Sequence, residues 1–173
     1  MYIRKLEIKD APLMLEWMQD ESVVQFLNKD FSSMTICDCE KFIRESHGDF
    51  RNLHFAIVDD SDTYMGTVSL KNICLDNDKS GGNAEFAIVL RQNAMGKNFS
   101  SKAMNEIITY GFSEMNLNEI YWFVSIKNLR ALRFYDKNGY KRLSLSEVAK
   151  NQWSFYFTDM LFQNYVWYSI KSR

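Results

Sequence analysis

Residues 90 to 101 include the residue types of an anion-binding turn. Gly96 permits close approach of the backbone to a ligand, and Asn98 tolerates a positive φ. A helix that starts here presents unpaired N–H groups and the positive end of its dipole, and Ser100 and Ser101 can add hydroxyl donors. Phosphate groups bind at such termini, although a glycine before a helix is more often a plain turn. The Walker and dinucleotide glycine patterns are absent, so this segment alone does not identify a ligand.

Glu85 is a candidate general base because it lies in an apolar stretch. Strand alternation places it on one face with Ala87 and Val89, and an acid in such surroundings could have a raised pKa. It could equally orient a substrate ammonium, deprotonate it through a water chain, or lie at the solvent end of its strand. His47 and His54 are the other conceivable bases, but neither lies in a motif.

A second constellation lies on a predicted helix that begins near Leu129. Ala131 and Tyr135 share one face of this helix at i and i+4, and Asn128 comes just before its first turn. The small Ala131 leaves room for a ligand beside the helix. The alternative for Tyr135 is a core position with its hydroxyl at the rim.

These side chains require a mixed array of strands and helices to bring them together. In the first half of the chain, the pattern predicts strands over Met1–Ile8, His54–Val58, Tyr64–Leu70 and Ala84–Leu90. It predicts helices from Asp10 onward, with Pro12 in the first turn, and over Thr35–Ser46. The second half predicts a helix over Asn98–Met115, a strand over Glu119–Ser125, a helix over Leu129–Lys137, a strand opening at Gly139-Tyr140 and a strand over Tyr165–Ile170. The resulting order is β-α-α-β-β-β-α-β-α-β-β, with an antiparallel front half and a single domain over residues 1–173.

Composition excludes several classes of protein. The 21 basic and 22 acidic side chains nearly cancel, unlike the clustered positive charge of a nucleic-acid binder. No apolar run approaches the ~20 residues of a membrane span, so no membrane partner is expected. Three cysteines without a secretory leader predict a cytoplasmic protein with reduced thiols. No cluster has metal-ligand spacing, and no metal is predicted.

Two motifs resemble those of the GNAT superfamily of N-acetyltransferases. The stretch from Asn83 to Phe99 resembles the acetyl-CoA loop of that family. The stretch from Asn128 to Tyr140 is similar to its second motif, Asn-x-x-[Ala/Ser]-x-x-x-Tyr-x-x-x-Gly-[Phe/Tyr]. Two motifs in the right order are far more specific than either one. Within the superfamily, the chain looks closest to the branch of ribosomal-protein N-terminal acetyltransferases and spermidine N-acetyltransferases.

The resemblance implies an α/β (α+β) GNAT fold. Its mixed, mostly antiparallel central sheet would have about seven strands, splayed at the fourth and fifth, with about four flanking helices. The family loop reads [Gln/Arg]-x-x-Gly-x-[Gly/Ala], and this chain departs from it at Asn93 and Asn98. Neither departure removes a backbone donor, so we expect coenzyme binding to persist.

The resemblance also implies that acetyl-CoA is the acetyl donor and assigns roles to individual residues. Tyr135 takes the position of the general acid that protonates the leaving thiolate, with Glu85 as the candidate base. The backbone near the end of the fourth strand would stabilise the thioester oxyanion. The implied cofactor-binding residues are Ile88, Val89, Leu90, Met95, Gly96, Lys97, Asn98, Phe99, Ser100, Ser101, Asn128, Ala131 and Tyr135.

The expected activity is direct transfer of acetyl to a primary amine. The acceptor could be a peptide N-terminus, a polyamine or another small amine, and the acids Asp20, Glu21 and Asp30 are suggestive of a polyamine without deciding it. The alternative is a non-catalytic CoA-binding module that acts as sensor or scaffold. A homodimer is possible, because the aromatic run from Trp153 to Phe157 fits either a core or a dimer surface.

Overall fold

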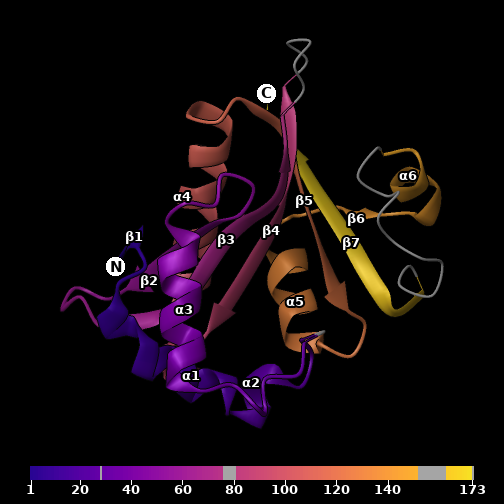
Figure 1. The fold of residues 1–173 in the computed structure, drawn as a ribbon. Helices are drawn as coiled ribbons and strands as arrows, with labels where there is room; N and C mark the ends of the chain where they lie inside the picture. Colours follow the sequence, from indigo (N-terminus) through magenta and orange to yellow (C-terminus); the bar gives the residue numbers. More distant parts are fainter. Residues whose placement is uncertain (28, 76–80, 152–162, 173) are drawn as a thin grey trace.

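The computed structural model describes residues 1–27, 29–75, 81–151 and 163–172, so the aromatic run from Trp153 to Phe157 lies outside the described residues. A seven-stranded sheet in the order β1-β2-β3-β4-β5-β7-β6 forms its centre (Figure 1). The strands are β1 (Tyr2–Lys5), β2 (Leu53–Val58), β3 (Tyr64–Cys74), β4 (Gly82–Leu90), β5 (Leu117–Ser125), β6 (Arg142–Leu143) and β7 (Tyr165–Lys171). The β4–β5 pair is parallel and the other pairs are antiparallel, which confirms the mixed, mostly antiparallel sheet that the resemblance implied.

Helices cover both faces of the sheet. Their bounds are η1 (Ile8–Asp10), α1 (Ala11–Met18), α2 (Glu21–Val24), α3 (Ile36–Ser46), η2 (Gln92–Ala94), α4 (Phe99–Ser113), α5 (Leu129–Lys137) and α6 (Leu145–Ala149). On β2, Ala56 and Val58 pack against α1 and α3, whereas Ile57 belongs to the core that contains α4 and α5. Because neighbouring side chains of a strand point to opposite faces, the α1–α3 layer and the α4–α5 layer lie on opposite sides of the sheet.

Several predicted boundaries required correction. The first strand ends at Lys5 instead of Ile8, because residues Ile8–Asp10 form a 3₁₀ turn. The strand expected at Gly139-Tyr140 starts at Arg142, since Gly139 (φ 78°) ends α5 in the left-handed region. The short helices α2 and α6 were not predicted. Asp10 precedes α1 as expected but does not cap it, because its carboxylate binds the Arg4 guanidinium at 2.8 Å.

The fourth and fifth strands separate halfway along their length. Their parallel pairing runs from Gly82↔Leu117 to Glu85↔Tyr121 and stops there. Beyond Glu85, β4 stays paired with β3 and β5 stays paired with β7. The sheet therefore opens between these strands, which confirms the predicted splay and leaves one edge of each strand without a strand partner.

Candidate active site

A pocket of about 710 Å³ occupies the opening between β4 and β5. Its lining includes the consecutive residues 85–89 of β4 and 122–125 of β5. Consecutive strand residues face opposite sides of a sheet, so the pocket extends through the sheet from one face to the other. One end lies beside α5, and the other lies under α1, α2 and α3. We call these the donor end and the acceptor end.

At the donor end, Tyr135 combines burial with an uncommitted hydroxyl. The residue is 5% exposed, and its ring lies 5.4 Å from the Trp122 ring and 5.2 Å from the Tyr168 ring. Within the described part of the chain, its hydroxyl makes no hydrogen bond, although the residue lines the pocket. Burial raises the pKa of the Tyr135 phenol, so the group keeps its proton throughout the ordinary pH range.

Asn128 and Ala131 line the same end of the pocket as Tyr135. The side chain of Asn128 accepts a hydrogen bond from the Ala131 N–H at 3.1 Å and so caps α5. This cap uses the side-chain carbonyl and leaves the amide NH₂ as a donor for a ligand. The predicted face of α5 therefore lies on the pocket, with a donor, a small residue and a phenol along it.

The loop before α4 has the backbone conformation that its residue types predicted. Gly96 (φ 77°) and Asn98 (φ 66°) are both left-handed, and Asn98 precedes Phe99, the first residue of α4. Ser100 and Ser101 lie in the first helical turn and are half-buried, whereas Lys97 is exposed. The residues from Met95 to Ser101 lie outside the pocket lining, on the surface beyond the donor end.

Two arginines that sequence reasoning missed hold this loop in place. Arg91 is 7% exposed, binds Glu16 of α1 at 2.8 Å and donates to the Tyr64 carbonyl at 3.0 Å. Arg130 of α5 contacts the Met95 sulfur at 2.6 Å. These contacts tie the two ends of the loop to helices on opposite faces of the sheet.

The β4 residues Ile88 and Val89 line the pocket, but Leu90 does not. Beyond Glu85, β4 has lost its strand partner on the pocket side, while β3 pairs with its other edge. Alternate residues of such an edge strand direct their N–H and C=O groups toward the open side. Backbone donors are thus available at the centre of the pocket, where a thioester carbonyl would need them.

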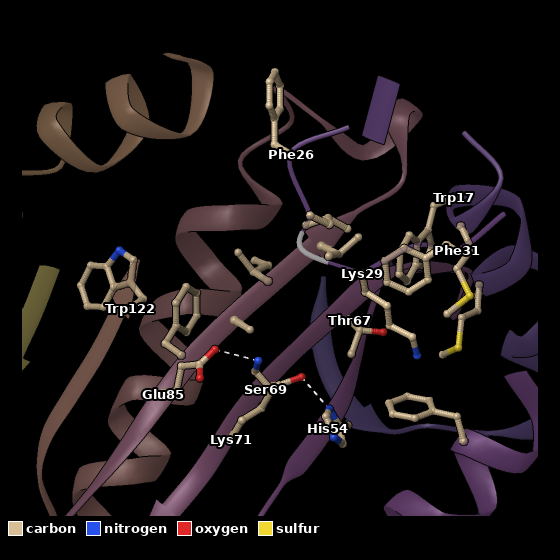
Figure 2. A pocket seen from close by; sticks show the side chains of 18 of the residues that line it. Trp17, Phe26, Lys29, Phe31, His54, Thr67, Ser69, Lys71, Glu85 and Trp122 are labelled. Carbon is tan, nitrogen blue, oxygen red and sulfur yellow. Dashed lines mark hydrogen bonds and ion pairs between the residues drawn. The ribbon is translucent and has the colours of Figure 1, made fainter. Parts of the chain in front are cut away.

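At the acceptor end, Glu85 is held by two donors. Its Oε1 lies 2.7 Å from the Lys71 ammonium (Figure 2). Its Oε2 accepts a hydrogen bond from the Asn72 side chain at 2.8 Å. Lys71 lies directly across from it on β3. Both carboxylate oxygens are therefore engaged, and the 6% exposure of Glu85 places it in the pocket wall rather than at a solvent end.

His54 forms a second polar pair on the same face. Its Nδ1 lies 2.8 Å from the Ser69 hydroxyl across the β2–β3 ladder, and its ring packs against Phe42 (Figure 2). Burial, with the Lys71 charge as a second cause, lowers the pKa of His54 to about 4. His54 is therefore neutral near pH 7. His47 binds the Leu6 carbonyl and does not line the pocket.

The outer wall of the acceptor end is apolar and comes from α1, α3 and the connection between α2 and α3. It consists of Met14, Trp17, Met18, Phe26, Leu27, Phe31, Met34, Cys39 and Phe42. The charged residues of this end, besides Lys71 and Glu85, are Lys29, Asp38, Lys41 and Glu45. The acids that suggested a polyamine lie elsewhere, because Asp20 caps α2 through the Ser22 N–H and Asp30 binds the Ser32 N–H.

The described residues contain no group of three or more metal-ligand side chains. Within the same residues, every helix is too short or too polar to cross a membrane.

Comparisons with known proteins agree with this arrangement. The acetyltransferase (GNAT) domain family matches residues 1–141. The uncharacterized N-acetyltransferase p20 of Bacillus licheniformis is 27% identical over 146 residues, which cover 83% of this chain and 80% of that protein. The spermidine N(1)-acetyltransferase of Vibrio cholerae is 33% identical over 57 residues, a third of each chain.

A solved structure shares the whole fold. The crystal structure of spermidine N-acetyltransferase from Vibrio cholerae, in complex with CoA and spermine, superposes with a TM-score of 0.76. It covers 98% of this chain and 94% of its own chain at 20% sequence identity. At this identity the likeness concerns the fold and leaves the acceptor open.

Proposed function

Because the chain belongs to the GNAT acetyltransferase family, an N-acetyltransferase family that uses acetyl-CoA, we propose that it transfers acetyl from acetyl-CoA directly to a primary amine in the β4–β5 opening. The observation that carries the proposal is the pocket that extends through the sheet, with Tyr135 at one end and Glu85 and His54 at the other. Donor and acceptor would enter from opposite faces and meet at residues 86–89. No covalent intermediate with the protein is needed.

We propose that the donor binds along the α4–α5 side. The N-terminus of α4 and the left-handed turn at Gly96 and Asn98 would hold the pyrophosphate, mostly through backbone N–H groups. The pantetheine arm would run past Ala131 and accept a bond from the Asn128 amide. Ile88 and Val89 would then face the thioester, which supplies an activated acetyl group.

The transfer needs one bond formed and one broken. The neutral amine nitrogen donates its lone pair to the acetyl carbon, and the C–S bond then breaks, with its electron pair going to sulfur. A backbone N–H at the open edge of β4 would stabilise the oxyanion. Tyr135 would donate its proton to the leaving sulfur and regain one from solvent, while the attacking nitrogen, positively charged after attack, would lose its second proton to solvent. The products are an acetamide, the CoA thiol and the proton that the ammonium lost.

An alkyl amine has a pKa of about 10.4 and is mostly protonated near pH 7. The ammonium must therefore lose that proton before attack. Glu85 remains our candidate for this step, acting through water because Lys71 and Asn72 occupy its oxygens. The neighbouring Ser69–His54 pair offers a further path for the proton. In this arrangement the ion pair also positions Glu85 for an incoming ammonium.

Acetyl transfer can be tested in two steps. A thermal-shift titration with acetyl-CoA should give a saturable rise in melting temperature, because a ligand that binds the native state stabilises it. Mass spectrometry of reactions with single amines should then show equal amounts of acetamide and free CoA thiol. Binding without acetylation of any amine would contradict the proposal and favour a non-catalytic CoA-binding module.

A further inference from the structure

We infer that the acceptor is a monoamine with an aromatic or bulky apolar body, and not a polyamine; this inference rests on the proposed acetyl transfer. The charges and the apolar wall of the acceptor end both point to such an acceptor (Figure 2). A polyamine carries two or more ammonium groups, so its site must supply carboxylates that are free to face them.

The carboxylates of the described lining are already engaged with this chain's own donors. Glu85 is bound by Lys71 at 2.7 Å and by Asn72 at 2.8 Å. Asp38 forms the capping box of α3 with Thr35, which lowers the pKa of that carboxyl. Glu45 pairs with Lys41 at 3.8 Å.

Cations balance these acids one for one. Lys29, Lys41 and Lys71 face Asp38, Glu45 and Glu85 within the described lining, and the neutral His54 adds no charge. Lys29 lies 5.4 Å from the centre of the Phe31 ring, so one aromatic face already has a cation over it. The described lining therefore has no acidic excess that would attract a polycation.

The wall favours an apolar body instead. Four aromatic residues (Trp17, Phe26, Phe31 and Phe42) and three methionines line the acceptor end, and the Trp17 and Phe31 rings meet edge to face at 5.3 Å. Aromatic rings and methionine sulfur pack well against an aromatic ligand. The indole N–H of Trp17 already donates to the Tyr64 hydroxyl, so an apolar ligand that covers this wall does not leave that N–H without a hydrogen bond.

The inference is tested by comparing kcat/KM for 2-phenylethylamine and spermidine. The unaltered protein should favour 2-phenylethylamine by about tenfold or more, since a well-filled apolar pocket discriminates on that order. Higher kcat/KM for spermidine would overturn the inference but leave acetyl transfer standing. Acetyl-CoA binding with neither amine acetylated, nor any other amine, would contradict both.

A charge-reversed variant provides a second, independent test. Lys29→Glu combined with Lys41→Glu changes two exposed side chains and frees Glu45 from its partner. This variant should raise the spermidine to 2-phenylethylamine ratio by about tenfold, and salt should reduce the gain because exposed charges are screened. Lys5→Glu, an equally exposed change outside the pocket, is the control and should leave the ratio unchanged. An unaltered ratio in the double variant would contradict the electrostatic argument.

Discussion

If the chain transfers acetyl as proposed, the donor end and the acceptor end of the pocket would recognise their ligands by different means. At the donor end, the features are backbone conformation and one helix face, with two left-handed residues before α4 and a capped α5 that presents Ala131 and Tyr135. At the acceptor end, the features are side chains from two helices, the connection between them and three strands. A backbone site tolerates many side chains, whereas a side-chain site changes its ligand with each substitution.

This contrast explains why a shared fold does not transfer a substrate. The Vibrio cholerae structure was solved with CoA and spermine, and it matches this chain over 98% of its length at 20% identity. A donor site built from backbone geometry can persist at such identity. The acceptor end, with its balanced charges and aromatic wall, has to be judged from this chain alone. If the two ends act separately, a substitution at one end should leave the ligand of the other end unaffected. The substitutions below test this, from the largest expected effect to the smallest.

Tyr135→Phe should produce the largest loss of rate. Removal of a general acid typically lowers kcat by about 10²-fold to 10³-fold. Acetyl-CoA affinity and melting temperature should stay unchanged, because the ring remains and the hydroxyl makes no hydrogen bond within the described residues. Steady-state kinetics and a thermal-shift titration measure the two quantities. An unchanged kcat would remove Tyr135 from the mechanism.

Glu85→Gln should affect only the acceptor side. We expect kcat/KM for the amine to fall about tenfold to 100-fold near pH 7, with the KM for acetyl-CoA unchanged. The loss should shrink as the pH approaches the amine pKa of about 10.4, where the free base no longer needs help to form. A pH profile of both proteins checks this, with Glu114→Gln, an exposed residue directly after α4, as control. A loss that is the same at every pH would assign Glu85 a purely structural role.

His54 should make stability depend on pH. Its pKa is about 4 in the folded chain and near 6.5 when unfolded, so the unfolded state binds more protons below pH 6.5. Stability should fall by up to about 2 kcal/mol as pH drops from 6.5 to 4, after allowance for partial exposure, and His54 should add no slope above 6.5. Denaturant unfolding of His54→Gln should show a flatter profile. An unchanged profile in His54→Gln would exclude His54 as the cause of the slope.

Gly96→Ala should weaken the donor end alone. The added Cβ meets no atom within 4 Å, but φ of 77° strains any residue other than glycine. The cost is about 1 kcal/mol, which corresponds to a rise of about fivefold in the KM for acetyl-CoA if the turn shifts. Gly48→Ala has the same open space without a positive φ and should leave this KM unchanged. Equal effects of the two substitutions would show that the left-handed turn is not needed.

The two ends also differ in how far they could be predicted from sequence. The donor end depends on local patterns, since Gly96, Asn98 and the face from Asn128 to Tyr135 each lie within one or two turns of chain. The acceptor end depends on strand register, which pairs Lys71 with Glu85 and Ser69 with His54 across β2, β3 and β4. A one-residue slip would reverse those faces, and nothing local sets the register. The pairing partners of Glu85 could not be predicted for this reason.

Short elements were missed for a related reason. The four-residue α2 and the five-residue α6 are too brief for a helical period to appear, although each begins after a capping residue, Asp20 and Ser144. Of the acids that suggested a polyamine, Asp20 is such a cap, Glu21 lies in the first turn of α2 and Asp30 binds the Ser32 N–H. Their types were informative about chain geometry rather than about the substrate.

The division between the ends is tested most directly by measuring both KM values in two variants, Gly96→Ala and Phe31→Ala. The account predicts that Gly96→Ala raises only the KM for acetyl-CoA, whereas Phe31→Ala raises only the KM for 2-phenylethylamine, by about tenfold through loss of its aromatic contact. Proportional changes of both KM values in either variant would contradict separate donor and acceptor ends.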